Sequence, residues 1–208
     1  MTKETPRDPE KFGRTLEIEA LKALAHPLRV QLFDALSTYG PATASGLAER
    51  LGESSGATSY HLRQLAKHDL VREVEGRGSG RERWWERVPG GIAIEAASES
   101  EAARHASKIV LGEWNTAREK QLTDFLTHGP DELSTEWMEA STVNTSNLAA
   151  TVEEVAEFME RIIGLINEFV DPRRDRSRPG TRPVQLQFSI FPVIGGDEIP
   201  TNDTPTTN

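Results

Sequence analysis

The segment from Ala42 to Arg87 constrains the fold most, because it joins two short helices through a tight turn. Apolar residues recur at helical spacing over 46–51 and again over 54–68. Ala48 is small enough for two helices to approach each other, and Gly52 tolerates the left-handed backbone of a turn between them. The spacing predicts a helix-turn-helix. Candidate caps for the two helices are Thr43 or Ser45 and Ser54 or Ser55.

A hairpin follows directly, with predicted strands over 70–74 and 83–88. Glycine and arginine alternate in its tip, 76–81, which predicts a flexible cationic loop that can lie against the minor groove or the phosphates of DNA. A plain solvated hairpin remains the alternative for the tip. Together the two helices and the hairpin predict a winged helix-turn-helix, which places one helix in the major groove.

The second of these helices has two distinct faces. Leu62, Leu65 and Ala66 are predicted to point inward, with Thr58 and His61 near the boundary. Hydroxyl groups accept several bases or phosphates, and arginine can contact a guanine edge through two hydrogen bonds. The polar residues on the outer face are Ser55, Ser59, Tyr60, Arg63, Gln64 and Lys67, of which Arg63 is the first candidate for base reading; contact with phosphate alone is the alternative.

Two helices precede this segment. The first is predicted from Thr15 to Ala25, and the His26-Pro27 step stops it because proline disfavours the α conformation of the residue before it. The second starts at Pro27, and Tyr39-Gly40-Pro41 ends it. Its predicted core face consists of Leu28, Val30, Leu32, Phe33, Ala35 and Leu36.

After Pro89-Gly90-Gly91 the pattern changes to long amphipathic segments. A helix with Ala102 on its inner face is expected over 98–127 and is broken by Gly129-Pro130; a strand or a short helix is expected over 136–143. Thr151 and Glu154 form a capping box that starts a helix ending at Asp171-Pro172, and strict alternation predicts a strand over 184–190. The fold class is therefore mainly α (α+β): a winged helix-turn-helix followed by a helix–strand–helix–strand region.

The expected domain organisation follows from these patterns. The ends are polar, and the predicted parts are a flexible arm (1–14), the winged DNA-binding domain (15–89), a dimerisation and candidate effector region (90–194) and a disordered tail (195–208). Apolar stripes at 16–25, 102–125 and 152–169 exceed what one minimal winged domain can bury. One of them is expected to form a dimer interface, although all three could also pack internally.

Charge and composition exclude several classes. The net charge is −9, yet residues 54–87 hold seven Lys/Arg against five Asp/Glu, whereas 128–208 hold six against fourteen, so a mildly basic module sits on an acidic remainder. The absence of cysteine excludes disulfides, thiolate zinc sites and thiol redox sensing. No apolar run approaches the ~20 residues of a membrane span, so the prediction is a soluble, cytoplasmic protein without membrane contact.

The chain resembles the ArsR-type winged helix-turn-helix regulators over about residues 16–88, and more narrowly their cysteine-free subgroup common in actinobacteria. The resemblance implies a homodimeric transcription factor, often a repressor, that binds a palindromic operator and is released or altered by a ligand. The segments that carry it are ALAHPLRVQLFDAL, SGLAERLGESSGATSYHLRQLAKHDLVREV and the glycine–arginine wing.

The resemblance also implies roles for individual residues. Two positions depart from the family pattern, because Glu53 stands where an apolar residue often packs and Thr58 where valine is common. The implied DNA contacts are Ser54, Ser55, Ser59, Tyr60 and Arg63 at or near the groove, Thr43, Gln64 and Lys67 on the backbone, and Arg77, Arg81 and Arg83 in the wing.

No metal, cofactor or catalytic site is predicted. Glu101 and His105 are spaced i, i+4, which could place two metal ligands on one helix face, but no second pair completes the pattern nearby. The sequence lacks a phosphate-binding glycine loop after a strand, G-x-S-x-G and H-E-x-x-H. The leading hypothesis is thus a dimeric, sequence-specific regulator that binds double-stranded DNA, with a small-molecule effector of unknown identity. The rival is a winged helix that binds a protein and not DNA.

Overall fold

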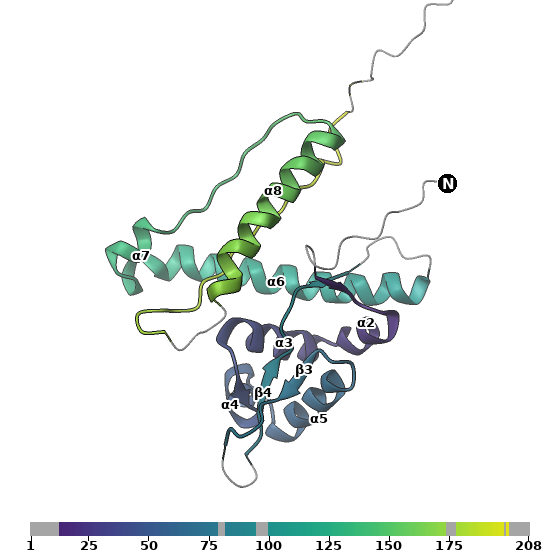
Figure 1. Ribbon diagram of the computed structural model, residues 1–208, viewed down its shortest axis with the longest axis vertical. Helices are drawn as coiled ribbons and strands as arrows, with labels where there is room; N and C mark the ends of the chain where they lie inside the picture. Colours follow the sequence, from purple (N-terminus) through teal and green to yellow (C-terminus); the bar gives the residue numbers. More distant parts are fainter. Residues whose placement is uncertain (1–12, 79–81, 95–99, 174–177, 198, 200–208) are drawn as a thin grey trace, which may run out of the picture.

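The computed structural model describes residues 13–78, 82–94, 100–173, 178–197 and 199. A compact unit of short helices and strands carries a long helix, α6, across one side, and α8 projects away from it (Figure 1). In chain order the elements are β1 (Arg14–Thr15), α2 (Ile18–Leu24), α3 (Pro27–Tyr39), β2 (Ala42–Thr43), α4 (Ala44–Leu51), α5 (Ser55–Ala66), β3 (Val71–Glu73), β4 (Trp84–Arg87), β5 (Ile92–Ala93), α6 (Glu101–Glu132), α7 (Thr135–Glu139), α8 (Val152–Val170) and the 3-10 turn η1 (Asp171–Arg173).

The helix-turn-helix has the predicted geometry. The Thr43 side chain accepts a hydrogen bond from Gly46 N and caps α4, and Gly52 ends it in the left-handed conformation at φ 70°. The Gly52 and Glu53 amides both donate to Ala48 O, which closes the turn. The predicted helix before it is confirmed as α3, and all six residues of its predicted core face are buried.

The wing is confirmed as the antiparallel pair β3–β4, but the sheet holds a third strand that the sequence did not predict. The strand order is β2-β4-β3, with Ala42 opposite Trp85 and Val71 opposite Arg87. Trp85 is buried in this sheet. The strand β2 enters α4 directly, so the sheet holds the start of the helix-turn-helix in place.

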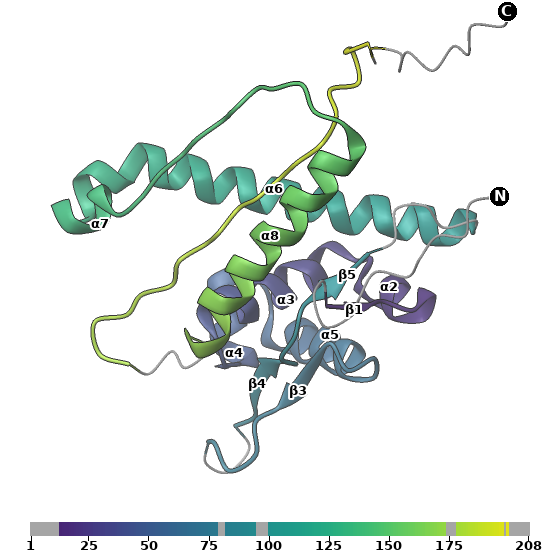
Figure 2. The ribbon, with the colours of Figure 1, turned by 45° about the horizontal axis from the view of Figure 1, so that its top comes forward.

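The prediction for the N-terminal helix is wrong at its first residues. Arg14 and Thr15 form β1, which pairs in parallel with β5 (Figure 2), and the helix begins only at Ile18. The amides of Arg14 and Leu16 donate to the carbonyls of Gly91 and Ala93. A partner almost eighty residues away leaves no local trace in the sequence. Residues 1–12 of the predicted arm lie outside the described residues.

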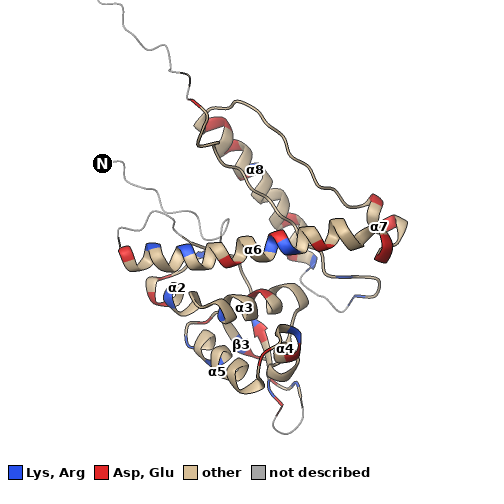
Figure 3. Cartoon of the chain, turned by 180° about the vertical axis from the view of Figure 1, so that it is seen from behind, with Lys and Arg blue, Asp and Glu red and all other residues tan. Residues whose placement is uncertain are grey.

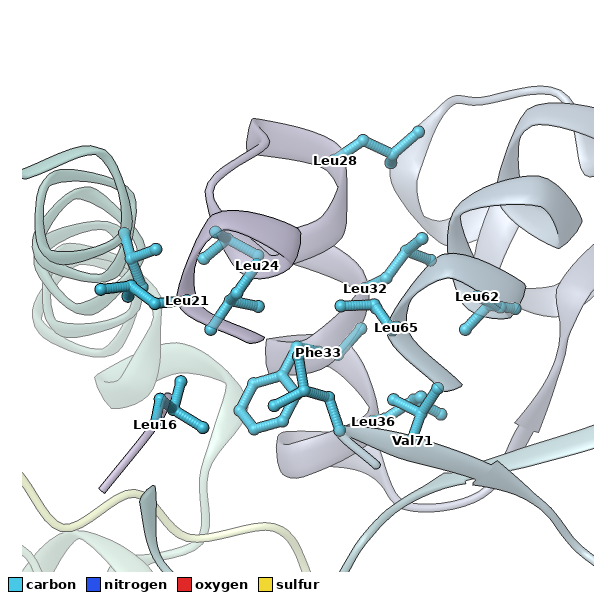
Figure 4. Close-up of a cluster of buried hydrophobic side chains, with 14 of the residues drawn as sticks. Leu16, Leu21, Leu24, Leu28, Leu32, Phe33, Leu36, Leu62, Leu65 and Val71 are labelled. Carbon is cyan, nitrogen blue, oxygen red and sulfur yellow. The ribbon is translucent and has the colours of Figure 1, made fainter. Parts of the chain in front are cut away.

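One hydrophobic core joins α2, α3, α4, α5, the wing and the start of α6. Figure 4 shows the part of it that comes from α2, α3, α5 and β3. Ala103, Ala106 and Val110 of α6 are buried in it, whereas Ala102, predicted on this face, is exposed. The buried stripe thus begins one residue later than predicted. The core continues past Pro89, where the sequence predicted the edge of the DNA-binding unit.

The long helix does not break at Gly129-Pro130, contrary to the prediction. α6 continues to Glu132, because a proline one turn from the end removes a single hydrogen bond and the glycine before it has no Cβ to clash with the ring. Gly129 is also buried; a Cβ there would lie 3.2 Å from the Phe125 ring and 3.5 Å from the sulfur of Met138. This close approach seats α7 against the end of α6.

Both strands predicted after α6 are wrong. Residues 135–139 form the helix α7, the alternative that the sequence left open, and residues 184–190 are extended but belong to no sheet among the described residues. The alternation of apolar and polar residues gives a strand one apolar face, but it does not provide the neighbouring strand with which the backbone forms hydrogen bonds. The capping box at Thr151 and Glu154 is confirmed.

Among the helices described, none is both long and apolar enough to cross a bilayer.

Candidate nucleic-acid interface

The start of α5 presents free backbone donors to the outside. Ser54 caps the helix by accepting a hydrogen bond from Ala57 N at 3.2 Å, and Ser54, Ser55 and Gly56 are all exposed. The unpaired amides of a helix's first turn and its macrodipole favour an anion such as a phosphate. Ser54 therefore shapes the helix end, and its hydroxyl still has a proton to donate.

The inner face of α5 anchors the helix firmly. Leu62 and Leu65 are fully buried in the main core. Thr58, predicted near the boundary, is buried as completely as these leucines, and its Oγ1 lacks a hydrogen-bond partner in the structure. The helix is thus held by apolar packing at positions three and four residues apart, which fixes the direction of its other face.

The outer face of α5 has the composition of a DNA-reading surface. Arg63 is exposed and makes no hydrogen bond or ion pair among the described residues, so its guanidinium is available. Lys67 donates to Gln64 Oε1 at 3.3 Å. Ser55, Tyr60, Arg63 and Lys67 are exposed, while Ser59 and Gln64 are half-buried.

Two histidine rings pack against each other at a tilt of 36° where α5 meets the α2–α3 junction. The ring centroids of His26 and His61 lie 4.5 Å apart, and Tyr60 meets the His61 ring edge-on at 5.1 Å. Burial lowers the pKa of His61, and the charges of His26 and Arg29 lower it further. Burial and these neighbours therefore disfavour the charged form of His61 at this junction.

The arginines of the wing that the structure describes are engaged within the protein. Arg77 stacks on the Trp84 ring at 3.8 Å, and Arg83 forms an ion pair with Glu73 across the strands at 2.7 Å. Arg72 pairs with Glu86 in the same way. Arg81, predicted to bind DNA, lies outside the described residues. Fewer positive charges of the described wing are consequently free to meet DNA than its number of arginines suggests.

Sequence reasoning missed Gly56 as a candidate contact. It lies in the first turn of α5, and a Cβ built there would meet no atom within 4 Å. Packing within the protein therefore does not require glycine at this position, although glycine weakens a helix. A close approach of DNA would require it. The only signal in the sequence is an unexplained glycine inside a helix.

Thr43 has a different setting from the other predicted contacts. It belongs to β2, is half-buried and caps α4, so its position is set by the sheet and not by α5.

Glu101 and His105, which were considered as metal ligands, are both exposed on α6. No group of three metal-binding side chains occurs in the part of the chain that is described.

The sequence of this region matches a family model. Residues 24–74 match the model described as a helix-turn-helix domain. This chain carries a helix-turn-helix domain. The matched residues include α4 and α5 and lie within the stretch over which the sequence resembles the ArsR-type regulators.

Several solved structures are also similar to this chain. The crystal structure of the antimony-specific repressor AntR is 22% identical with a TM-score of 0.33, over 49% of this chain and 78% of that one. A possible transcriptional regulator for arsenical resistance is 24% identical with a TM-score of 0.30, over 51% and 95%. ZitR of Lactococcus lactis is 19% identical with a TM-score of 0.26, over 72% and 81%. No curated protein matches the sequence.

Proposed function

We propose that this chain is a sequence-specific transcription regulator that binds double-stranded DNA as a homodimer on a palindromic operator and acts as a repressor. The observation that carries the proposal is the outer face of α5, where an unpaired Arg63 stands among hydroxyl and amide side chains while the inner face is locked in the core. A rigid helix with free polar groups is what reading of base edges requires.

The proposed contacts are of two kinds, those to base edges and those to the DNA backbone. α5 would enter the major groove with Arg63 on a guanine edge and Ser55, Ser59 and Tyr60 beside it. Phosphates would meet the start of α5 at Ser54. The residues that would hold the backbone are Thr43, Gln64, Lys67 and the wing arginines Arg77, Arg81 and Arg83.

Pairing of two copies supports selective binding. One winged module contacts a single half-site, and two-fold dimers place their reading helices ~34 Å apart on one side of the duplex. The regulator would act in the cytoplasm, where bacterial DNA lies. A small-molecule effector remains part of the proposal, with its identity open.

Selection of bound duplexes from a random pool tests this function with the intact protein. We expect a two-fold symmetric motif whose affinity falls steeply with salt. Arg63→Ala should cost about 1–3 kcal/mol against the selected duplex and relax the preference at one position in each half-site. Arg77→Ala is the matched control, because it should weaken binding to selected and random duplexes alike.

Equal affinity for random and selected duplexes would contradict sequence-specific binding. The rival function, a winged helix that binds a protein, makes a different prediction. In that case DNA shift assays are blank, and replacement of Ser59 and Arg63 abolishes a protein complex instead.

A further inference from the structure

Trp84 and Trp85 are neighbours in β4 but have different surroundings. Successive side chains of a strand point to opposite faces of its sheet. Trp85 is buried in the main core, so Trp84 belongs to the outer face of the wing, where it is half-buried. Trp84 is neither part of the core nor among the half-buried residues packed against it. The hydrophobic core therefore does not account for a tryptophan at position 84.

The contact that Trp84 does make is with an arginine of the same hairpin. The guanidinium carbon of Arg77, in the loop between β3 and β4, lies 3.8 Å from the centre of the Trp84 ring. Among aromatic side chains, tryptophan attracts a cation most strongly, and arginine is the cation found most often on such rings. The Trp84 ring thus holds the Arg77 side chain in one place.

The backbone after Arg77 is fitted closely to this ring. A Cβ at Gly78 would lie 2.8 Å from Glu82 O and 2.9 Å from Cδ1 of Trp84, too close for the backbone to stay where it is. Gly76 also has a positive φ, +71° against +98° at Gly78, but a Cβ there would meet no atom within 4 Å. Contact with the ring therefore requires glycine at position 78 and not at position 76.

The stack leaves the hydrogen-bonding edge of Arg77 open. The N–H donors of a guanidinium lie in its plane, whereas an aromatic ring contacts its face. Arg77 is exposed and makes no hydrogen bond or ion pair within the described part of the chain.

Two other wing arginines differ from Arg77 in this respect. The described wing carries both signs of charge (Figure 3). The donors of Arg72 and Arg83 point to the carboxylates of Glu86 and Glu73, each at 2.7 Å. A phosphate would have to displace a carboxylate from either of them. It can meet Arg77 while the stack on the ring stays intact.

The pair of Arg77 and Trp84 also lies where the proposed function needs a cation. α6 crosses one side of the compact unit, while α5 and the wing lie on the other (Figure 1). Trp84 stands opposite Thr43 in the sheet, and directly opposite residues share a face. The Thr43 side chain caps α4. The ring is therefore next to the start of the helix-turn-helix.

We propose that Trp84 is a positioning residue for DNA binding, which acts by holding Arg77 so that its guanidinium meets a phosphate of the duplex. The inference rests on the proposed function and deepens it. A flexible side chain loses rotamer freedom when it binds, and an arginine that is already held in place loses less. Trp84 strengthens binding through Arg77 and not through a contact of its own with DNA.

Two substitutions of Trp84 in the intact protein test the proposal. Trp84→Leu keeps apolar bulk without an aromatic face, and Trp84→Phe keeps the face; neither changes the charge. We expect Trp84→Leu to bind selected and random duplexes about two- to fivefold more weakly, the size of one exposed cation–π contact. Trp84→Phe should lose less than about twofold. Fluorescence anisotropy of a labelled duplex measures both, and far-UV circular dichroism checks that both variants fold.

A double-mutant cycle separates positioning from direct contact. Arg77→Ala should lower the slope of log affinity against log salt by about 0.9, the share of one phosphate. When Arg77→Ala is already present, Trp84→Leu should have no further effect, because no arginine is left to hold. Losses that add would show that Trp84 acts on DNA or on the fold by itself, and would overturn the proposal.

The two glycines give a matched pair in the same loop. Gly78→Ala should displace the loop from the ring and weaken DNA binding as Trp84→Leu does, whereas Gly76→Ala should stay close to the wild type. Equal losses at the two positions would overturn the role of the ring in holding this loop. Wild-type affinity in Trp84→Leu would overturn this inference alone. A wild-type chain that binds no duplex would refute the proposed function together with it.

Discussion

The part of the molecule before residue 111 and the part after it differ in how far their side chains are buried. In the first, the large side chains of α2, α3, α4 and α5 converge on one core, and Leu24, Leu32, Leu47, Leu62 and Leu65 are fully buried. In the second, over the described residues from 111 to 194, Gly129 alone is buried. The first part is held by its own hydrophobic core, whereas in the second the apolar side chains stay at least partly exposed.

The two parts contribute differently to the stability of the chain. Hydrophobic burial is the dominant favourable contribution to folding, at about 25 cal/mol for each Å² of apolar surface, so the core around α3 and α5 supplies most of the stability of the chain. A 19-residue helix such as α8, by comparison, is marginal without packing. Its capping box fixes where it starts, but none of its apolar residues is buried.

The sharpest test of the contrast is a matched pair of leucine truncations. Leu62→Ala in α5 should lower the free energy of unfolding by about 2–5 kcal/mol, because it opens a cavity in the core. Leu165→Ala in α8 should cost less than about 1 kcal/mol in dilute protein, since that side chain is already in water. Urea unfolding followed by far-UV circular dichroism measures both. Equal losses would contradict the division.

The boundary between the two parts carries a pH-dependent contribution. Asp34 on α3 is half-buried, and burial raises its pKa to about 6, although the charges of Arg118 on α6 and Arg87 on β4 offset part of this effect. The native state therefore binds this proton more tightly than the unfolded chain. Its favourable contribution is complete below the unfolded pKa of 3.8 and is lost as the pH rises through about 6.

Asp34→Asn should remove this loss. The variant should be more stable than the wild-type chain at pH 8, by at most about 3 kcal/mol, and the difference should shrink toward pH 4. Unfolding free energies of both proteins from pH 4 to pH 8 measure it. A variant that is less stable at pH 8 would show that the attraction of the Arg118 charge outweighs the burial of the carboxylate.

Thr58 offers a smaller test inside the well-packed part. Its hydroxyl is buried without a partner, so Thr58→Val should stabilise the chain by about 1 kcal/mol, because the unsatisfied polar atom is removed at constant volume. Thr116→Val on α6 is the control. That hydroxyl is exposed and donates to Gly112 O, so the change should be within about 0.5 kcal/mol. Thermal melting at pH 7 compares the two variants, and a destabilised Thr58→Val would be the contrary result.

Substitution of Gly56 should have the smallest effect on stability, and it tests DNA binding separately from folding. Gly56→Ala should stabilise α5 by about 0.5 kcal/mol, because the space is open and alanine favours a helix. It should nevertheless weaken binding to the selected duplex if the DNA backbone approaches this position. Gly112→Ala on α6 also enters open space and should stabilise without loss of DNA binding. Unchanged DNA affinity in Gly56→Ala would remove this residue from the interface.

The candidate site could be located from the sequence with fair completeness. Ala48 and Gly52 indicate the turn, and of the residues predicted to face out of the second helix Ser55, Tyr60, Arg63 and Lys67 are exposed while Ser59 and Gln64 are half-buried, because helical periodicity is a local property. What the sequence could not indicate is how each group is engaged. The pairing of Arg83 with Glu73 and the stacking of Arg77 on Trp84 depend on the register of the wing. The DNA contacts themselves stay predictions.

The sequence by itself determined the elements whose signals are local: the bounds of α3 between Pro27 and Gly40, the turn at Gly52, and the start of α8 at its capping box. Only the tertiary structure decided the pairing of β1 with β5, the addition of β2 to the wing and the lack, among the described residues, of a partner strand for 184–190. Caps, turns and periodicity act within a few residues, whereas a strand exists only if a distant backbone completes its hydrogen bonds.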